Sequence, residues 1–96
     1  MLTVTAERAY EFGLVNDVVD EGGALDAAIA LAERICANAP IAVRESRAVV
    51  LAADVENDEA LWKMSAKAMR AVMATEDFNE GPRAFIEKRP AQWTGR

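Results

Sequence analysis

The sequence predicts a mainly α-helical fold of four to five helices with one short strand. Apolar residues recur at steps of three and four over residues 25–39, which is the spacing of one helix face and marks the clearest helix. Gly, Pro and Asn separate these segments, as expected at helix ends. Only residues 14–19 have the β-branched composition of a strand.

The first predicted elements are a two-turn helix and the strand. Thr5 is a candidate N-cap for a helix over Ala6–Phe12, and Gly13 suits the position after its last turn. Residues 14–19 follow as a run of about the usual strand length. No second strand-like run exists to pair with it, so it is either one strand of a sheet lying elsewhere or a loop.

Three longer helices follow. The first spans residues 25–39 and has Asn38 in its terminal turn. The second starts with Pro40 at its first position and extends to about Ala53. The third is capped by Asn57 or Asp58 and extends to about Ala74.

A last helix is expected after a break over Thr75–Asn79, with Asn79 as its candidate N-cap. Its acidic residues lie near its start, and Lys88 and Arg89 lie at its end, where they complement the helix dipole. Pro90 stops the helix, and residues 91–96 form a tail that contains Trp93.

The helix over residues 60–74 is apolar around most of its circumference. Lys63, Lys67 and Arg70 form one narrow polar stripe, whereas an ordinary surface helix has an apolar face of a little over 100°. A chain of this size cannot easily enclose such a helix. Part of it is therefore expected to face another chain or a further domain.

Charge and composition exclude several classes of function. Eleven Lys and Arg against sixteen Asp and Glu give a net charge of −5, which argues against nucleic-acid binding and against a polybasic membrane anchor. No apolar run reaches the roughly 20 residues of a membrane span. A cytoplasmic location is the expectation.

Residues able to carry chemistry are few. The chain has no His, and its single Cys36 lies on an apolar helix stripe, so a buried structural thiol is favoured over a nucleophile. The scattered Glu residues are interpreted as a solvated helix face. Trp62 and Trp93 are interpreted as packing anchors.

Three strings nevertheless resemble the enoyl-CoA hydratase/isomerase (crotonase) family, in the family's order and over essentially the whole chain. They are residues 5–19 (TAERAYEFGLVNDVV), 37–43 (ANAPIAV) and 75–90 (TEDFNEGPRAFIEKRP), with WTGR at 93–96 as the tail. The last string is the most specific and is similar to the crotonobetainyl (carnitinyl)-CoA hydratase branch.

The resemblance covers the C-terminal third of the family and implies the C-terminal helical region of the crotonase-like α/β spiral fold. Residues 1–20 would be the end of the spiral core, and residues 21–96 a helical oligomerisation domain. The oxyanion hole and the catalytic acids belong to the preceding part of the family fold. No catalytic residue is therefore expected in this chain, and neither a metal nor a cofactor; a CoA thioester would be the substrate of the parent enzyme.

The resemblance also implies two contacts to CoA. Lys88 matches the position that approaches a CoA phosphate, and Met69 matches a position where an aromatic often packs near the adenine. The expected partners are further copies of the chain, as a trimer or hexamer, or a catalytic-half partner, together with acyl-CoA.

Three hypotheses follow for the function. The first is a C-terminal fragment of an enzyme of acyl-CoA or fatty acid metabolism, inactive alone, that provides trimer packing and a CoA-contacting helix. The second is a standalone helical oligomerisation module. The third is a CoA-binding or regulatory module that assembles with full-length paralogues and has no catalysis of its own.

Overall fold

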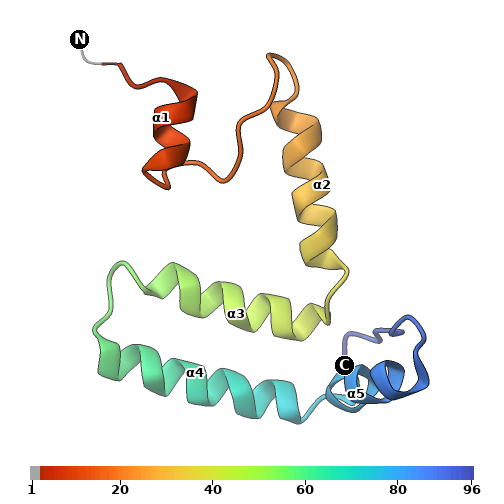
Figure 1. The fold of residues 1–96 in the computed structure, drawn as a ribbon. Coiled ribbons are helices and arrows are strands. Elements are labelled where there is room, and N and C mark those ends of the chain that lie inside the picture. The colour runs from red at the N-terminus through yellow and green to blue at the C-terminus, as the bar shows by residue number, and fades with distance from the viewer. Residues whose placement is uncertain (1–2) are drawn as a thin grey trace. The chain divides into compact units, whose positions relative to one another are not determined.

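A computed structural model describes residues 3–96 and contains five helices in that range (Figure 1). They are α1 (Ala6–Glu11), α2 (Ala24–Cys36), α3 (Pro40–Ala52), α4 (Asp58–Met73) and α5 (Glu76–Glu87). The chain divides into two compact units, of which the first ends at Ala32 and the second spans Glu33–Arg96. The mainly helical prediction is confirmed.

Helix α1 is stabilised by local signals at both ends. Thr5 Oγ1 accepts a hydrogen bond from the Arg8 N–H at 3.2 Å, as expected of an N-cap. At the other end Gly13 has φ +74°, and its N–H donates to the Tyr10 carbonyl at 3.0 Å. The Leu14 N–H donates to the carbonyl five residues back at 2.9 Å, which completes a Schellman motif. The predicted Thr5 cap and Gly13 terminus are confirmed.

Residues 14–19 do not form the predicted strand. The segment is turn and irregular backbone, and all six residues are exposed. A strand needs a partner for its backbone groups, and no strand is assigned anywhere in residues 3–96. The Asp17 carboxylate instead accepts from the Val18 N–H at 2.8 Å. The alternative interpretation of this segment as a loop is therefore the correct one for this chain.

Helix α2 ends earlier than expected because an asparagine caps it. The Asn38 side-chain amide donates to the carbonyls of Arg34 and Ile35, at 3.2 and 3.0 Å, so these carbonyls have partners without a further turn. Pro40 then begins α3 in the predicted position.

Helices α3 and α4 form an antiparallel hairpin, in which they lie side by side (Figure 1). Asn57 caps α4 by accepting from the Ala60 N–H at 2.9 Å, in agreement with the prediction. One side of α4 packs against α3 and is half-buried. Trp62 and Met73 of the same helix are 73% and 54% exposed.

Helix α5 begins one turn earlier than the sequence predicts. Thr75, not Asn79, is the N-cap, and its hydroxyl accepts from the Phe78 N–H at 3.1 Å. Acidic residues at the two following positions stabilise the positive end of the helix dipole. Because Thr75 already nucleates the first turn, Asn79 lies inside the helix, and so does Pro82.

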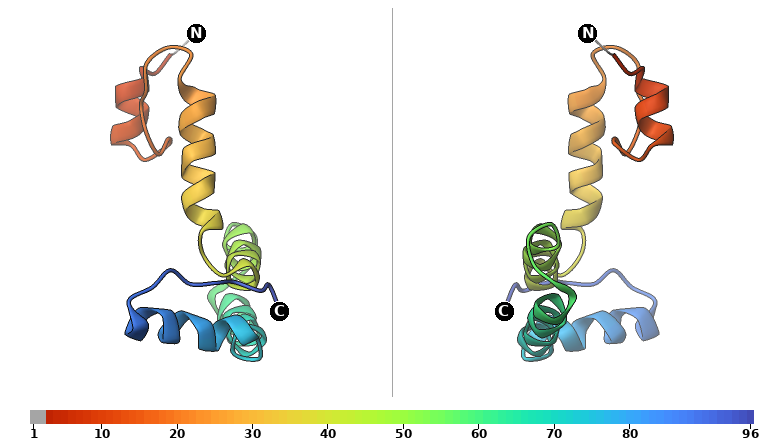
Figure 2. Two further views of the ribbon diagram at one scale, coloured as in Figure 1. Left: turned by 90° about the vertical axis from the view of Figure 1, so that its right-hand side faces the viewer. Right: turned by 90° about the vertical axis from the view of Figure 1, so that its left-hand side faces the viewer.

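The tail, residues 91–96, folds back alongside α5 (Figure 2). Trp93 lies against Gly81 of α5, where a Cβ atom added to the glycine would be 3.5 Å from the indole ring. The indole N–H donates to the Ala37 carbonyl at 2.8 Å. Trp93 is therefore the packing anchor that the sequence predicts.

The described residues contain very little core. Ala84 and Asp77 are the only two of them that are buried. Large apolar side chains are exposed on every helix, among them Phe85 at 86% and Ile86 at 78%. The expectation that this chain does not enclose its apolar helix faces is confirmed.

Candidate functional site

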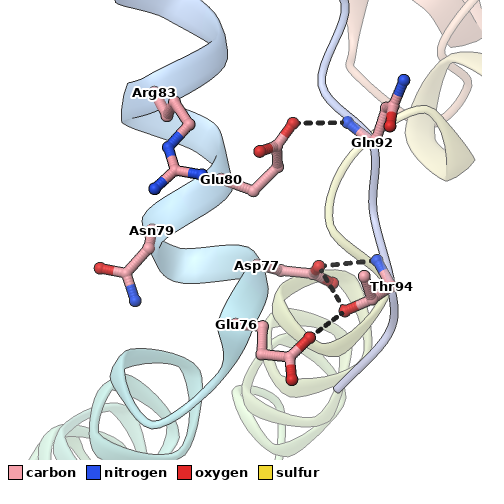
Figure 3. A pocket seen from close by; sticks show the side chains of 7 residues that line it. All are labelled: Glu76, Asp77, Asn79, Glu80, Arg83, Gln92 and Thr94. Atoms are coloured by element: carbon pink, nitrogen blue, oxygen red, sulfur yellow. Dashed lines mark hydrogen bonds between the residues drawn. The ribbon is translucent and has the colours of Figure 1, made fainter.

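A first carboxylate of the second unit, that of Asp77, holds the tail (Figure 3). One oxygen accepts from the Thr94 N–H at 2.7 Å and from its hydroxyl at 3.0 Å; the other accepts from the Gly95 N–H at 2.9 Å. Beside it, the Glu76 N–H donates to the Arg96 carbonyl at 2.8 Å. Asp77 is thus a buried carboxylate with hydrogen-bond donors at both oxygens.

A second carboxylate, Glu80, holds the chain reversal between α5 and the tail. Its Oε1 and Oε2 accept from the two terminal nitrogens of Arg89, at 2.6 and 3.1 Å, in a bidentate pair. Oε1 also accepts from the Gln92 N–H at 2.9 Å (Figure 3). Arg89 pairs in addition with Glu87 through Nε. We refer to the contacts of Glu80 with Arg89 and Gln92 as the Glu80 clasp.

The reversal contains Lys88 in a left-handed conformation, with φ 52° and ψ 44°. Its N–H donates to the Phe85 carbonyl at 3.3 Å, and the Arg89 N–H donates to the Ala84 carbonyl at 3.1 Å. These bonds form a second Schellman motif, in which a lysine occupies the position that usually carries glycine. The Lys88 side chain is exposed.

The electrostatics of the tail contacts favour the charged forms of both acids. The hydrogen bond from the Thr94 backbone, followed by weaker contributions from Gly95 and the Thr94 hydroxyl, holds the pKa of Asp77 below its usual value. The Arg89 side chain, helped by the Gln92 N–H, lowers the pKa of Glu80 to about 2. The same contact with Glu80 raises the pKa of Arg89. Both acids are therefore ionised at neutral pH.

The pocket beside these contacts has a volume of about 190 Å³, and the residues around it are of polar types. It is lined by Glu76, Asp77, Asn79, Glu80, Arg83, Gln92 and Thr94. Asp77 and Glu80 already accept hydrogen bonds from the tail, and their low pKa values make them poor proton donors near pH 7. The pocket is consequently a docking place for the tail rather than a pair of acids ready for proton transfer.

A wider apolar groove of about 420 Å³ runs between α3 and α4. Met69 lies at its edge, where it is 56% exposed, and Val49, Val50 and Val72 are among the other lining residues. A flexible thioether at the edge of an apolar groove can pack against a flat ring. The lining residues of this groove do not include Lys88, the other predicted CoA contact.

Several interpretations of single residues need correction. Arg89 does not end the helix as a dipole-complementing residue, because Glu80 and Glu87 bind its guanidinium. Glu80 is not part of a solvated helix face, because its carboxylate is paired with the Arg89 guanidinium. Cys36 and Trp62 are exposed rather than packed, because nothing within residues 3–96 covers the apolar faces that carry them.

The Glu80 clasp is the feature of this site that the sequence does not predict. A glutamate nine residues before an arginine that precedes a proline is a weak signal by itself. The pairing depends on the chain reversing direction at Lys88, which the sequence does not reveal.

Two further kinds of feature are absent from the part of the chain that the structure describes. No cluster of three or more His, Cys, Asp or Glu side chains there could hold a metal ion. Within the same residues, each helix is too short or too polar to cross a lipid bilayer.

Comparison with known proteins places the chain in a well-populated group. The family model described as enoyl-CoA hydratase/isomerase matches residues 2–96. Enoyl-CoA hydratase EchA19 of Mycobacterium tuberculosis is 36% identical over 93 residues, which are 97% of this chain and 35% of that protein. The carnitinyl-CoA dehydratase of Salmonella arizonae is 36% identical over 96 residues, covering 96% of this chain and 37% of that protein.

Solved structures agree with these matches. The crystal structure of an enoyl-CoA hydratase from M. tuberculosis H37Rv superimposes with a TM-score of 0.84 at 42% sequence identity, over 95% of this chain and 36% of that chain. The 96 residues thus span little more than a third of the length of the proteins that they match.

Proposed function

The chain belongs to the enoyl-CoA hydratase/isomerase family, and we propose that it supplies the packing helices and a CoA-contacting turn of an enzyme acting on acyl-CoA thioesters. Residues 1–20 end the spiral core of that enzyme, and residues 21–96 form its helical oligomerisation domain. The cytoplasm is the proposed location.

The packing role rests on the apolar surface that the second unit exposes. Trp62 and Met73 are exposed on α4, and Phe85 and Ile86 are exposed on α5. Exposed apolar side chains in this number are typical of surfaces that are covered in an assembly. Their proposed partners are further copies of the chain, as a trimer or hexamer, together with the part of the enzyme that carries catalysis.

The proposed CoA contact rests on Lys88. The ammonium group projects from an exposed turn, and among the hydrogen bonds and ion pairs of residues 3–96 none involves this side chain. Glu87, its neighbour in the chain, is paired with Arg89 instead. A free lysine of this kind can bind a phosphate as a point charge. Met69 is the second proposed contact and packs near the adenine.

Catalysis is assigned to residues outside this chain. The polar pocket offers two acids that the tail occupies, and the chain has no histidine. The enolate chemistry of the family requires a pair of oxyanion donors and proton-transferring acids. The 96 residues alone are therefore expected not to hydrate crotonyl-CoA, and hydration above background would overturn this part of the proposal.

Titration calorimetry with CoA tests the contact directly. Lys88→Ala should weaken CoA binding about fivefold, because one exposed charge contact to phosphate is lost. Lys67→Ala is the matched control, since it removes an exposed lysine from α4, and it should leave the affinity unchanged. Equal affinity for Lys88→Ala and wild type would overturn the contact.

Sedimentation equilibrium tests the packing role. The wild-type chain should self-associate, and Trp62→Glu should shift it to monomer because a charge cannot be buried in an apolar interface without a partner. A wild-type chain that is monomeric and unaffected by the substitution would refute packing between copies.

A further inference from the structure

The left-handed lysine at the end of α5 requires support from outside the backbone motif. Lys88 is the only non-glycine residue with positive φ among residues 3–96. A side chain in this conformation is disfavoured, because its Cβ approaches the following carbonyl oxygen. Strained residues of this kind persist where surrounding contacts hold them, and they are frequent at functional positions.

The Glu80 clasp provides that support. Glu80 lies two turns before the end of α5, and its carboxylate reaches past Lys88 to the Arg89 guanidinium and the Gln92 N–H. The Glu80 side chain is 16% exposed and that of Arg89 33%, so the pair is partly shielded from water. A bidentate pair in such surroundings fixes orientation as well as distance.

The clasp also determines which charged side chain at the turn remains unpaired and able to bind a ligand. Glu80 and Glu87 both bind Arg89, and this leaves the ammonium of Lys88 without a carboxylate partner in residues 3–96. Three of the four charged groups at the turn, Glu80, Glu87 and Arg89, are thereby paired with each other. The fourth group, the Lys88 ammonium, projects into solvent.

We propose that Glu80 is a positioning residue for phosphate recognition: by binding Arg89 and Gln92 it keeps the turn left-handed and directs the Lys88 ammonium outward. Glu80 itself does not touch the ligand. This inference rests on the CoA contact proposed above for Lys88. The ligand group is a phosphate of CoA. Pantetheine has no phosphate, so substitution of Glu80 should not change the affinity for pantetheine.

The test is a double-mutant cycle on CoA affinity in the full 96-residue chain. Glu80→Gln should weaken CoA binding about threefold to fivefold, because a neutral amide holds the guanidinium less firmly. In a Lys88→Ala background the same change should have no further effect. Glu59→Gln is the matched control, since Glu59 is an exposed helical glutamate paired with Lys63, and it should not alter the affinity.

A second measurement separates positioning from general loss of structure. Amide hydrogen exchange at Arg89 should accelerate in Glu80→Gln, whereas exchange within α3 and α4 should stay at wild-type rates. The Glu80→Gln variant and the wild type should bind pantetheine with equal affinity.

The outcomes distinguish the two proposals. If Lys88→Ala binds CoA like wild type, the CoA contact is refuted, and the role of Glu80 with it. If Lys88→Ala weakens binding but Glu80→Gln does not, the contact stands and the positioning role is refuted. A Glu80→Gln effect that persists undiminished in the Lys88→Ala background also refutes positioning.

Discussion

Helices α1 and α5 end in the same backbone motif, but the two ends are held in different ways. At the end of α1 the left-handed residue is Gly13, and a Cβ added there would meet no atom within 4 Å. At the end of α5 it is Lys88, and the Glu80 clasp joins the helix before it to the residues that follow it. The first turn uses the conformational freedom of glycine, whereas the second uses tertiary contacts.

The difference shows that the end of α5 carries a lysine side chain in a left-handed position, where a non-glycine residue lowers stability. Glycine would satisfy the backbone at the end of α5 as it does at the end of α1. A lysine in that position is informative because the backbone does not require it. The comparison therefore bears on the contact proposed for Lys88, because it is the side chain, and not the turn, that a glycine would remove.

The largest effect is expected when the pH is lowered. Protonation of Asp77 and Glu80 should release the tail, so that only the backbone hydrogen bonds of the Schellman motif still hold the end of α5. Asp77 and Glu80 have lowered pKa values in the folded chain, the latter about 2. Their stabilising contribution is therefore complete above about pH 4.5, the unfolded value of a glutamate, and is lost as the pH falls toward 2.

Trp93 fluorescence monitors this release in a Trp62→Phe background, which removes the other tryptophan. Emission should shift to longer wavelengths between about pH 4.5 and pH 2 as the indole becomes solvated. Emission that is constant over this range would show that the two carboxylates do not hold the tail.

The next effect concerns the anchor of the tail. Trp93→Ala removes the contact with Gly81 and the hydrogen bond to the Ala37 carbonyl, and it should destabilise the second unit by about 2 kcal/mol. Urea unfolding followed by circular dichroism measures this loss. Val55→Ala, at an exposed position between α3 and α4, is the control and should cost much less.

A smaller effect is expected at the glycine end of the comparison. Gly13→Ala places a Cβ at φ +74° and should weaken the end of α1 by about 1 kcal/mol, since no tertiary contact compensates there. Amide exchange at Leu14, whose N–H closes the motif, should accelerate about fivefold. Unchanged exchange would mean that α1 does not depend on glycine at its end.

The smallest effect is expected at Gly81, which lies inside α5 directly before Pro82. An added Cβ would be in ordinary contact with the Trp93 ring at 3.5 Å. The gain in helix propensity is opposed by the clash between a Cβ and the ring of a following proline in helical backbone, so Gly81→Ala should change the stability of the second unit by less than about 0.5 kcal/mol. A change of several kcal/mol in urea unfolding would contradict this balance.

These contrasts also explain how much the sequence can predict. The caps at Thr5 and Asn57 and the terminus at Gly13 are predictable because each signal acts within a few residues. The start of α5 is not, because Thr75 and Asn79 are competing caps, and only the structure shows which one binds a backbone N–H.

Features that depend on distant partners cannot be predicted in this way. Residues 14–19 have strand propensity, yet propensity alone forms no strand without a neighbouring one. The Glu80 clasp joins residues nine and twelve apart along a chain that reverses direction between them. The apolar stripe around Cys36 predicts a buried thiol, but no part of residues 3–96 covers that stripe, and the thiol is exposed.

The most direct test of the role of Lys88 is the thermal melt of Lys88→Gly, followed by circular dichroism with and without excess CoA. Glycine relieves the left-handed strain and should stabilise the chain by about 1 kcal/mol without ligand. The same change removes the ammonium group, so the rise in melting temperature that CoA gives the wild type should shrink. Stability and ligand response should thus change in opposite directions. A Lys88→Gly chain that keeps the full response to CoA would contradict the assignment of CoA binding to this lysine.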